Sequence, residues 1–138
     1  MIVLLQIFSC FFLTGLIWVI QLVHYPSFLF VREERFQTFG RFHSWRISCI
    51  VMPLMIVELL SAIALVWSSP EVFWIVNLIL VMSVWTFTFV LSVPRHQRLA
   101  QGFSLIEIES LILTNWPRTI VWSLRSCGLA IWLLPKLQ

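Results

Sequence analysis

Apolar residues form four long runs in this 138-residue chain, at about residues 2–22, 47–67, 73–93 and 112–134. A helix needs about 20 mostly apolar residues to cross about 30 Å of hydrocarbon. The first three runs have that length, and the fourth has it when the apolar residues from Leu111 onward are counted. The pattern predicts an all-α fold, an integral membrane four-helix bundle that forms one domain over residues 1–138.

The connections between the runs are unequal. Residues 68–71 make a tight turn, so the second and third helices are expected to be antiparallel neighbours. Residues 27–45 and 95–111 interleave apolar side chains with Arg and Glu. Such amphipathic segments favour the membrane interface, either as helix extensions or as short surface helices.

Charged residues are scarce and unevenly placed. They make up 11% of the chain, whereas an average soluble domain has about 25%. The net charge of +3 does not indicate nucleic-acid binding, because the basic residues form no stripe with interleaved aromatics. Seven lie in or beside the two long connections, namely Arg32, Arg35, Arg41, Arg46, Arg95, Arg98 and Arg118. Basic residues favour the cytoplasmic side, so we expect a multi-pass protein of the cell inner (plasma) membrane with both termini outside the cytoplasm.

The two halves of the chain share a weak pattern of matched residues. Three pairs are each 72 positions apart: Thr14 and Thr86, His24 and His96, Arg46 and Arg118. A parallel two-plus-two repeat would relate the halves by an axis along the membrane normal, with the binding site at their junction. The alternative is that apolar sequences resemble one another through composition alone.

Two charged residues lie inside the apolar runs, Glu58 in the second and Arg125 in the fourth. A charge at such depth is costly and is usually paired or functional. At about 1.5 Å per residue, Glu58 lies about 16 Å in from Ile47 and Arg125 about 10 Å in from Arg118, a difference that an Arg side chain can cover. We expect an ion pair, which either locks the second helix to the fourth or serves a ligand site.

Polar residues gather on one face of three helices, at spacings of three and four. The faces are Thr14, Trp18, Gln21 and Tyr25; Asn77, Trp85, Thr88, Ser92 and His96; and Arg118, Trp122, Arg125, Gly128 and Trp132. A lipid-facing side would not collect these groups, so the faces are expected to line the bundle interior. Pro94 is expected to kink the third helix.

These faces predict a polar pocket that opens toward the cytoplasm and has Glu58 and Arg125 at its floor. Its rim would carry His24, His43, Arg46, His96, Asn115 and Arg118. We expect the three arginines of the pocket to bind the acidic edge of a flat aromatic ligand, while Glu58 orients Arg125. For Arg46 and Arg118 the alternative is that they extend to lipid headgroups.

Aromatic residues complete this predicted pocket. Trp18, Trp85 and Trp122 are the deepest tryptophans and would stack on the face of the ligand, and Tyr25 is a further candidate contact. The remaining tryptophans lie near the ends of the runs, as in an aromatic belt.

The three histidines are candidate catalytic residues. A pair formed by His24 and His96 across the repeat axis would move protons near neutral pH or ligate a metal or haem, and His43 is expected to matter less. The chain has no His-Glu-x-x-His sequence and no Glu-x-x-His of a di-iron bundle. Haem and quinone both stay open as cofactors.

Residues 94–99 (PRHQRL) and 115–119 (NWPRT) resemble the small four-helix membrane proteins grouped with the anthrone oxygenases, in which a Pro-x-Asn-x-x-Leu-like turn precedes a Trp/Arg-rich final helix. His96 stands where that pattern has Asn. The resemblance implies fold more than function. Residues 25–30 are similar to the junction after helix one of the small bacterial protoporphyrinogen oxidase, a haem-binding membrane protein. The candidate haem ligands of that family, an early His and a later Lys, are missing here, since the only Lys is Lys136.

Two functional hypotheses follow. The first is a small membrane oxidoreductase or oxygenase that binds a flat, redox-active aromatic molecule, such as a quinone, a polycyclic phenol or a porphyrin. The second is a non-catalytic membrane subunit that holds an anionic lipid or the transmembrane helix of a partner, in a membrane complex or a homo-oligomer. Both involve membrane lipids and neither involves nucleic acid.

Overall fold

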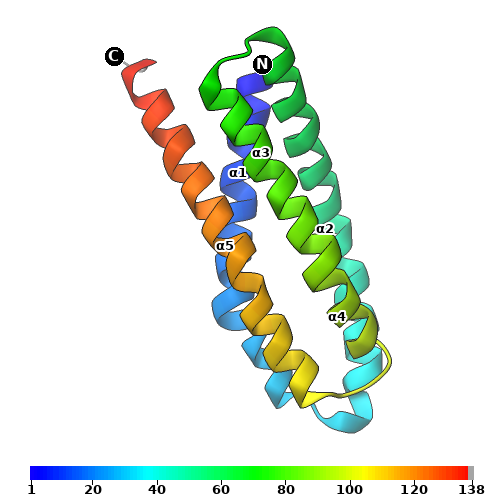
Figure 1. The fold of residues 1–138 in the computed structure, drawn as a ribbon. Helices are drawn as coiled ribbons and strands as arrows, with labels where there is room; N and C mark the ends of the chain where they lie inside the picture. Colours follow the sequence, from blue (N-terminus) through cyan, green and yellow to red (C-terminus); the bar gives the residue numbers. More distant parts are fainter. Residues whose placement is uncertain (137–138) are drawn as a thin grey trace.

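The computed structural model describes residues 1–136, which form four long helices with no strand among them; 91% of these residues are helical (Figure 1). The elements are α1 (Ile2–Val19), the π-helical turn η1 (Ile20–His24), the 3₁₀ turn η2 (Pro26–Phe30), α2 (Glu33–Ser68), α3 (Val72–Phe87), the π-helical turn η3 (Thr88–Ser92), α4 (Val93–Leu99), α5 (Leu105–Leu133) and the 3₁₀ turn η4 (Leu134–Lys136). The all-α bundle is confirmed. Three continuous helical segments, Ile2–Phe30, Glu33–Ser68 and Val72–Leu99, are long and apolar enough to cross a membrane.

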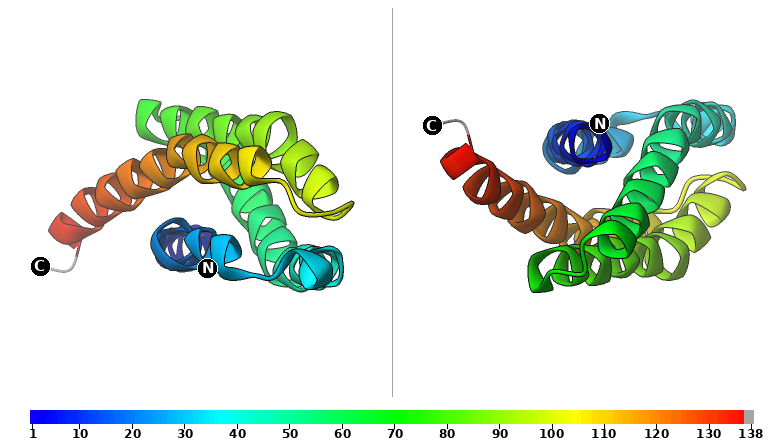
Figure 2. Two further views of the ribbon diagram at one scale, coloured as in Figure 1. Left: turned by 90° about the horizontal axis from the view of Figure 1, so that it is seen from below. Right: turned by 90° about the horizontal axis from the view of Figure 1, so that it is seen from above.

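Each long helix packs against two others, so that the four close into a ring (Figure 2). The order around the ring is α1, α2, α3 with its continuation α4, α5, and then α1 again. The tight turn after Ser68 makes α2 and α3 antiparallel neighbours, as expected. Both termini lie at one end of the bundle, and the two long connections lie at the other (Figure 1).

Two helices begin earlier than the hydrophobic runs indicate. α2 begins at Glu33 rather than near residue 47, and the acidic Glu33 and Glu34 in its first turn suit the positive end of the helix dipole. α5 begins at Leu105 rather than near residue 112, because Ser104 caps it by accepting a hydrogen bond from the backbone N–H of Glu107. Most of the two amphipathic segments is therefore helix extension.

Prolines follow the two π-helical turns. Pro26 comes two residues after η1, and Pro94 comes two residues after η3. Proline lacks an N–H and clashes with the carbonyl four residues earlier, and the wider π turn relieves that conflict. The turns start 68 positions apart, at Ile20 and Thr88, so helix register pairs His24 with Ser92 and not with His96.

Gly40 sets the distance between α2 and the end of α4. A Cβ atom at this position would lie 2.8 Å from the backbone oxygen of Leu99. The next residue of α2, Arg41, donates from Nε to the carbonyl of Ala100 at 3.3 Å. This close approach positions the first half of α2, including His43, against α4.

Candidate functional site

Three histidines cluster at the end of the bundle that holds the long connections; they come from η1, α2 and α4. His24 Nε2 and His43 Nδ1 are 2.7 Å apart, so one ring donates a hydrogen bond to the other. The ring of His43 also lies beside that of His96, with 5.3 Å between ring centres. His43, which was expected to matter less, is the central imidazole, and His24 is bonded to it rather than facing His96.

Tyr25 joins the histidines to an arginine. Its hydroxyl is 3.0 Å from His96 Nε2 and accepts a hydrogen bond from Arg118 Nη2 at 3.5 Å. Tyr25 is almost fully buried and Arg118 is 5% exposed. The phenol oxygen therefore lies between an imidazole and a guanidinium inside the bundle.

Amide and hydroxyl groups hold the Arg118 side chain. Asn115 Oδ1 accepts hydrogen bonds from Nε, at 3.1 Å, and from Nη2, and Thr88 Oγ1 accepts one from Nη1 at 3.3 Å. Asn115 in turn donates to Gln21 Oε1 at 2.7 Å. Among residues 1–136 no carboxylate forms an ion pair with Arg118. The guanidinium is thus a buried positive charge that only neutral groups solvate.

An apolar cavity of about 90 Å³ lies next to these polar groups. Leu13, Leu16, Ile17 and Ile20 of the first helical segment, Ile47, Val51 and Met52 of α2, and Val93 of α4 line most of it. At its polar end are Tyr25, Thr88, Ser92, His96 and Arg118. The site therefore combines an apolar chamber with the Tyr25 hydroxyl, the His96 imidazole and the Arg118 guanidinium.

A second cavity of about 240 Å³ adjoins the first. The two share Ile47, Ser48, Val93 and His96 in their walls. The second cavity lies between α2 and α4 and adds Ser44, Gln97 and Ala100. His96 is thus reached from both chambers.

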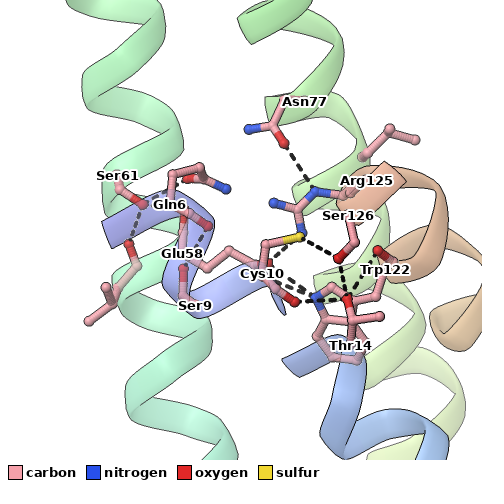
Figure 3. A network of polar contacts seen from close by, with 12 residues as sticks. Gln6, Ser9, Cys10, Thr14, Glu58, Ser61, Asn77, Trp122, Arg125 and Ser126 are labelled. Carbon is pink, nitrogen blue, oxygen red and sulfur yellow. Dashed lines mark hydrogen bonds and ion pairs between the residues drawn. The ribbon is translucent and has the colours of Figure 1, made fainter. Parts of the chain in front are cut away.

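The predicted ion pair between Glu58 and Arg125 is present and fully buried (Figure 3). Arg125 Nη1 donates to Glu58 Oε1 at 2.5 Å, and Arg125 Nε donates to Asn77 Oδ1 at 3.2 Å. Trp122 Nε1 donates to both carboxylate oxygens, at 3.2 and 3.3 Å. The pair therefore ties α2 to α5 and, through Asn77, to α3.

The ion pair is not the floor of the cavity. Trp122, which is 1% exposed, lines the cavity, whereas Glu58 and Arg125 do not. The indole lies between the chamber and the carboxylate to which it donates. Arg125 and Glu58 are therefore positioned to orient Trp122. The expected direct contact of Arg125 with a ligand is not available in this cavity, because Arg125 does not line it.

Three further residues predicted for the pocket lie outside it. Trp18 is 38% exposed, packs edge-on against Trp116 and donates to Ser123 Oγ at 3.0 Å. Trp85 is half-buried and lies against Phe89.

Arg46 is the third of the predicted pocket residues that lie away from the cavity. It is exposed, and its guanidinium lies 5.2 Å from the ring centre of Phe42. Of the predicted ligand contacts, those brought together at the cavity or around Arg118 are His96, Tyr25, Arg118, Asn115 and Trp122.

The polar contacts of the three imidazoles are to one another and to Tyr25. No group of three His, Cys, Asp or Glu residues in the part of the chain described is arranged to hold a metal ion. The ring nitrogens of His24 and His43 point at one another, and His96 Nε2 points at the Tyr25 hydroxyl. The polar contacts of the cluster are suited to passing protons rather than to surrounding a cation.

Some polar residues of the interior were not singled out from the sequence. Thr119 is fully buried beside Asn115 and Gln21, and Gln6 accepts a hydrogen bond from Ser61 Oγ at 2.7 Å. Their signal is present in the sequence, since a Gln early in an otherwise apolar run and a Thr four residues after Asn115 both mark an interior face.

Comparisons with protein families, with characterised proteins and with solved structures find no match to this chain.

Proposed function

We propose that this chain is a membrane protein that binds a lipophilic ring compound of the quinone or phenol type. The ligand's oxygen would lie at Tyr25, His96 and Arg118, and its ring in the apolar chamber against Trp122. The observation that carries the proposal is an apolar cavity with one polar end, where a buried guanidinium has no carboxylate partner among residues 1–136. Ligand sites are mostly apolar with a few convergent polar groups that fix orientation.

The chemistry of the polar end favours an electron-rich oxygen. A buried cation without a counter-charge is costly, and a carbonyl or phenolate oxygen would reduce that cost. Arg118 offers N–H donors, and Tyr25 and His96 can each donate or accept. A quinone carbonyl and a phenolic hydroxyl therefore both find complementary groups at this end.

The histidine cluster adds proton exchange to binding. His96 borders the chamber, His43 lies beside it, and His24 is hydrogen-bonded to His43. A phenolic ligand that gives its proton to His96 becomes an oxygen anion next to the Arg118 guanidinium, and the proton remains on the imidazole. His43 and His24 then provide further acceptors toward the end of the bundle.

The size of the chamber favours a small ring over a porphyrin. A cavity of about 150 Å³ is enough for benzene, and the first chamber offers about 90 Å³ with about 240 Å³ adjoining it. One substituted ring can use both chambers through the walls that they share. A porphyrin would need a far larger space than either.

Direct binding tests the proposal. Purified protein in lipid nanodiscs is titrated with a tailless dimethoxy-methyl-benzoquinone, alongside Arg118→Gln and Tyr25→Phe. Since a hydrogen bond to a charged group is worth about 1.5–3 kcal/mol, Arg118→Gln should weaken binding by about tenfold to a hundredfold. The matched control is Arg46→Gln, which removes one exposed positive charge and should leave the affinity unchanged.

The same experiment distinguishes the rival hypothesis. If the nanodiscs bind a fatty acid in an Arg118-dependent manner and do not bind the benzoquinone, the site belongs to a non-catalytic subunit that holds an anionic lipid. Solvent extraction of protein purified from membranes, followed by mass spectrometry, identifies any ring compound that it carries. An absorption spectrum with a Soret band would favour a porphyrin and contradict the proposal.

The orientation of the bundle is part of the proposal. We propose that the histidine end faces the cytoplasm, because Arg32, Arg35, Arg41 and Arg98 gather there and are exposed. A reporter inserted between α4 and α5, after Gln101, should then register inside the cell. A reporter inserted at the turn after Ser69 should register outside, and the reverse pattern would contradict this orientation.

A further inference from the structure

We propose that the ligand of this site carries an apolar tail that leaves the bundle between α1 and α2, so that its class is an alkylated or prenylated ring compound taken from the bilayer. The inference rests on the proposed function and names the substrate class of the same cavity. The observations that support it are which sides of the cavity are closed and which sides are open.

The chamber and the cavity beside it are too small to enclose a ring together with a long tail. Their volumes of about 90 and about 240 Å³ reach only the lower end of the roughly 300–1,000 Å³ of sites that bury drug-sized ligands. The polar end of the chamber is occupied by Arg118 and its hydrogen-bond partners, and Trp122 closes the chamber toward the Glu58 carboxylate. A ring that reaches Arg118 must therefore extend any further apolar group out of the chamber.

The walls of the chamber are buried on some sides and less buried on two others. The contributions from α5 and η3 are buried, as are those of Leu13, Ile17 and Ile20. The less buried wall residues form two groups, Leu16 of α1 with Ile47, Val51 and Met52 of α2, and Ser48 of α2 with Val93 and His96 of α4. The first group frames an opening between two helices that belong to segments long and apolar enough to span a membrane.

The second opening lies between α2 and α4, nearer the end of the bundle that carries the long connections. Its wall is mostly apolar but includes Ser44, Ser48 and Gln97, whose hydroxyl and amide groups prefer water to an apolar tail. The opening between α1 and α2 reaches deeper along both helices and is framed by the apolar side chains of Leu16, Val51 and Met52. It is therefore the path for the tail, and the second opening suits the exchange of water and protons with His96.

A tail-length comparison in wild-type and opening variants tests the inference. The probes are a tailless dimethoxy-methyl-benzoquinone and its decyl derivative, each expressed per mole of lipid in nanodiscs to remove differences in partitioning. In Met52→Trp the added indole should obstruct the opening, so decyl-quinone binding should weaken by about tenfold more than binding of the tailless probe does. Leu16→Trp, from the opposite side of the opening, should act in the same direction.

The matched control is Ile56→Trp, one turn along the same face of α2, where the side chain is exposed and does not line the cavity. Helical content and thermal unfolding check that each variant is folded. Equal weakening of both probes in both opening variants, or of neither, would overturn the inference. If wild-type protein binds the tailless probe in an Arg118-dependent manner but does not bind the decyl derivative, the inference fails and the proposed function stands. If wild-type protein binds neither probe, both fail.

Discussion

His43 Nδ1 lies 2.7 Å from His24 Nε2, which makes the two imidazoles a hydrogen-bonded pair that joins α2 to the end of the first helical segment. An N–H···N bond needs one bare ring nitrogen, so the two rings cannot both be fully protonated while the bond exists. His43 Nε2 is buried and has no protein partner. The pair is thus held together by this one shared proton and by packing.

This geometry makes a spectroscopic prediction. ¹⁵N NMR of histidine-labelled protein in nanodiscs at neutral pH should find one donor and one bare nitrogen across the His24–His43 contact. His43→Phe should shift the His24 ring signals, whereas Tyr25→Phe should shift His96 and leave His24 unchanged. The assignment would be refuted by spectra in which His24 and His43 are both doubly protonated.

The buried ion pair predicts strong coupling between two substitutions. Glu58→Gln and Arg125→Gln each leave an uncompensated charge in the interior, which should cost about 3–5 kcal/mol of unfolding free energy. The double variant should lose clearly less unfolding free energy than the sum of the losses in the two single variants, as measured by denaturant unfolding in mild detergent.

The exposed pair formed by Arg98 and Glu107 is the control for this cycle. Arg98 Nη1 and Glu107 Oε1 are 2.7 Å apart, but the Arg98 side chain is 62% exposed. Its removal should change stability by at most about 1 kcal/mol. Additive effects at Glu58 and Arg125 would show that the buried pair contributes no coupling.

Gly40 predicts a packing defect with a simple comparison. In Gly40→Ala the new methyl group meets the backbone oxygen of Leu99 at 2.8 Å, and a backbone oxygen cannot move aside as a flexible side chain can. We expect a loss of about 1–3 kcal/mol and a weakened contact between α2 and α4, read out as altered His43 and His96 ring signals.

Gly15→Ala is the matched substitution. Gly15 also lies inside a helix, but apart from its chain neighbours and its own helix backbone no atom lies within 4 Å of the position of its added Cβ. Because Ala is the better helix former, this variant should gain up to about 1 kcal/mol. Equal effects of the two alanines on stability would contradict the role given to Gly40.

Much of the polar interior could be predicted from the sequence alone. Apolar run length predicts the membrane helices, since hydrocarbon thickness sets how many residues a span needs. A charge within such a run must find a partner, which is why Glu58 and Arg125 could be paired before any geometry was known. The His-, Tyr- and Arg-bearing end of the bundle follows from the same reasoning.

The central position of His43 and the outlying positions of Trp18 and Trp85 could not be predicted in this way. Counting by threes and fours is valid only within a regular α-helix, and each π-helical turn adds a residue that rotates the face by about 100°. Trp18 precedes η1 and Trp85 precedes η3, while Tyr25 and His96 follow them. Residues that share a stripe in the sequence therefore point in different directions in space.

The sequence by itself determined the set of helices and the identity of the residues that cannot face lipid. The free-energy cost of placing a polar group against lipid depends only on the chemistry of that group and on the apolar run around it. Only the tertiary structure decided which of these residues meet. The rotation, tilt and axial register of one helix against another depend on close contacts such as Gly40 against Leu99, and on where a turn widens. In the tertiary structure Trp122 lies between the ion pair and the cavity, and no carboxylate of the described residues pairs with Arg118.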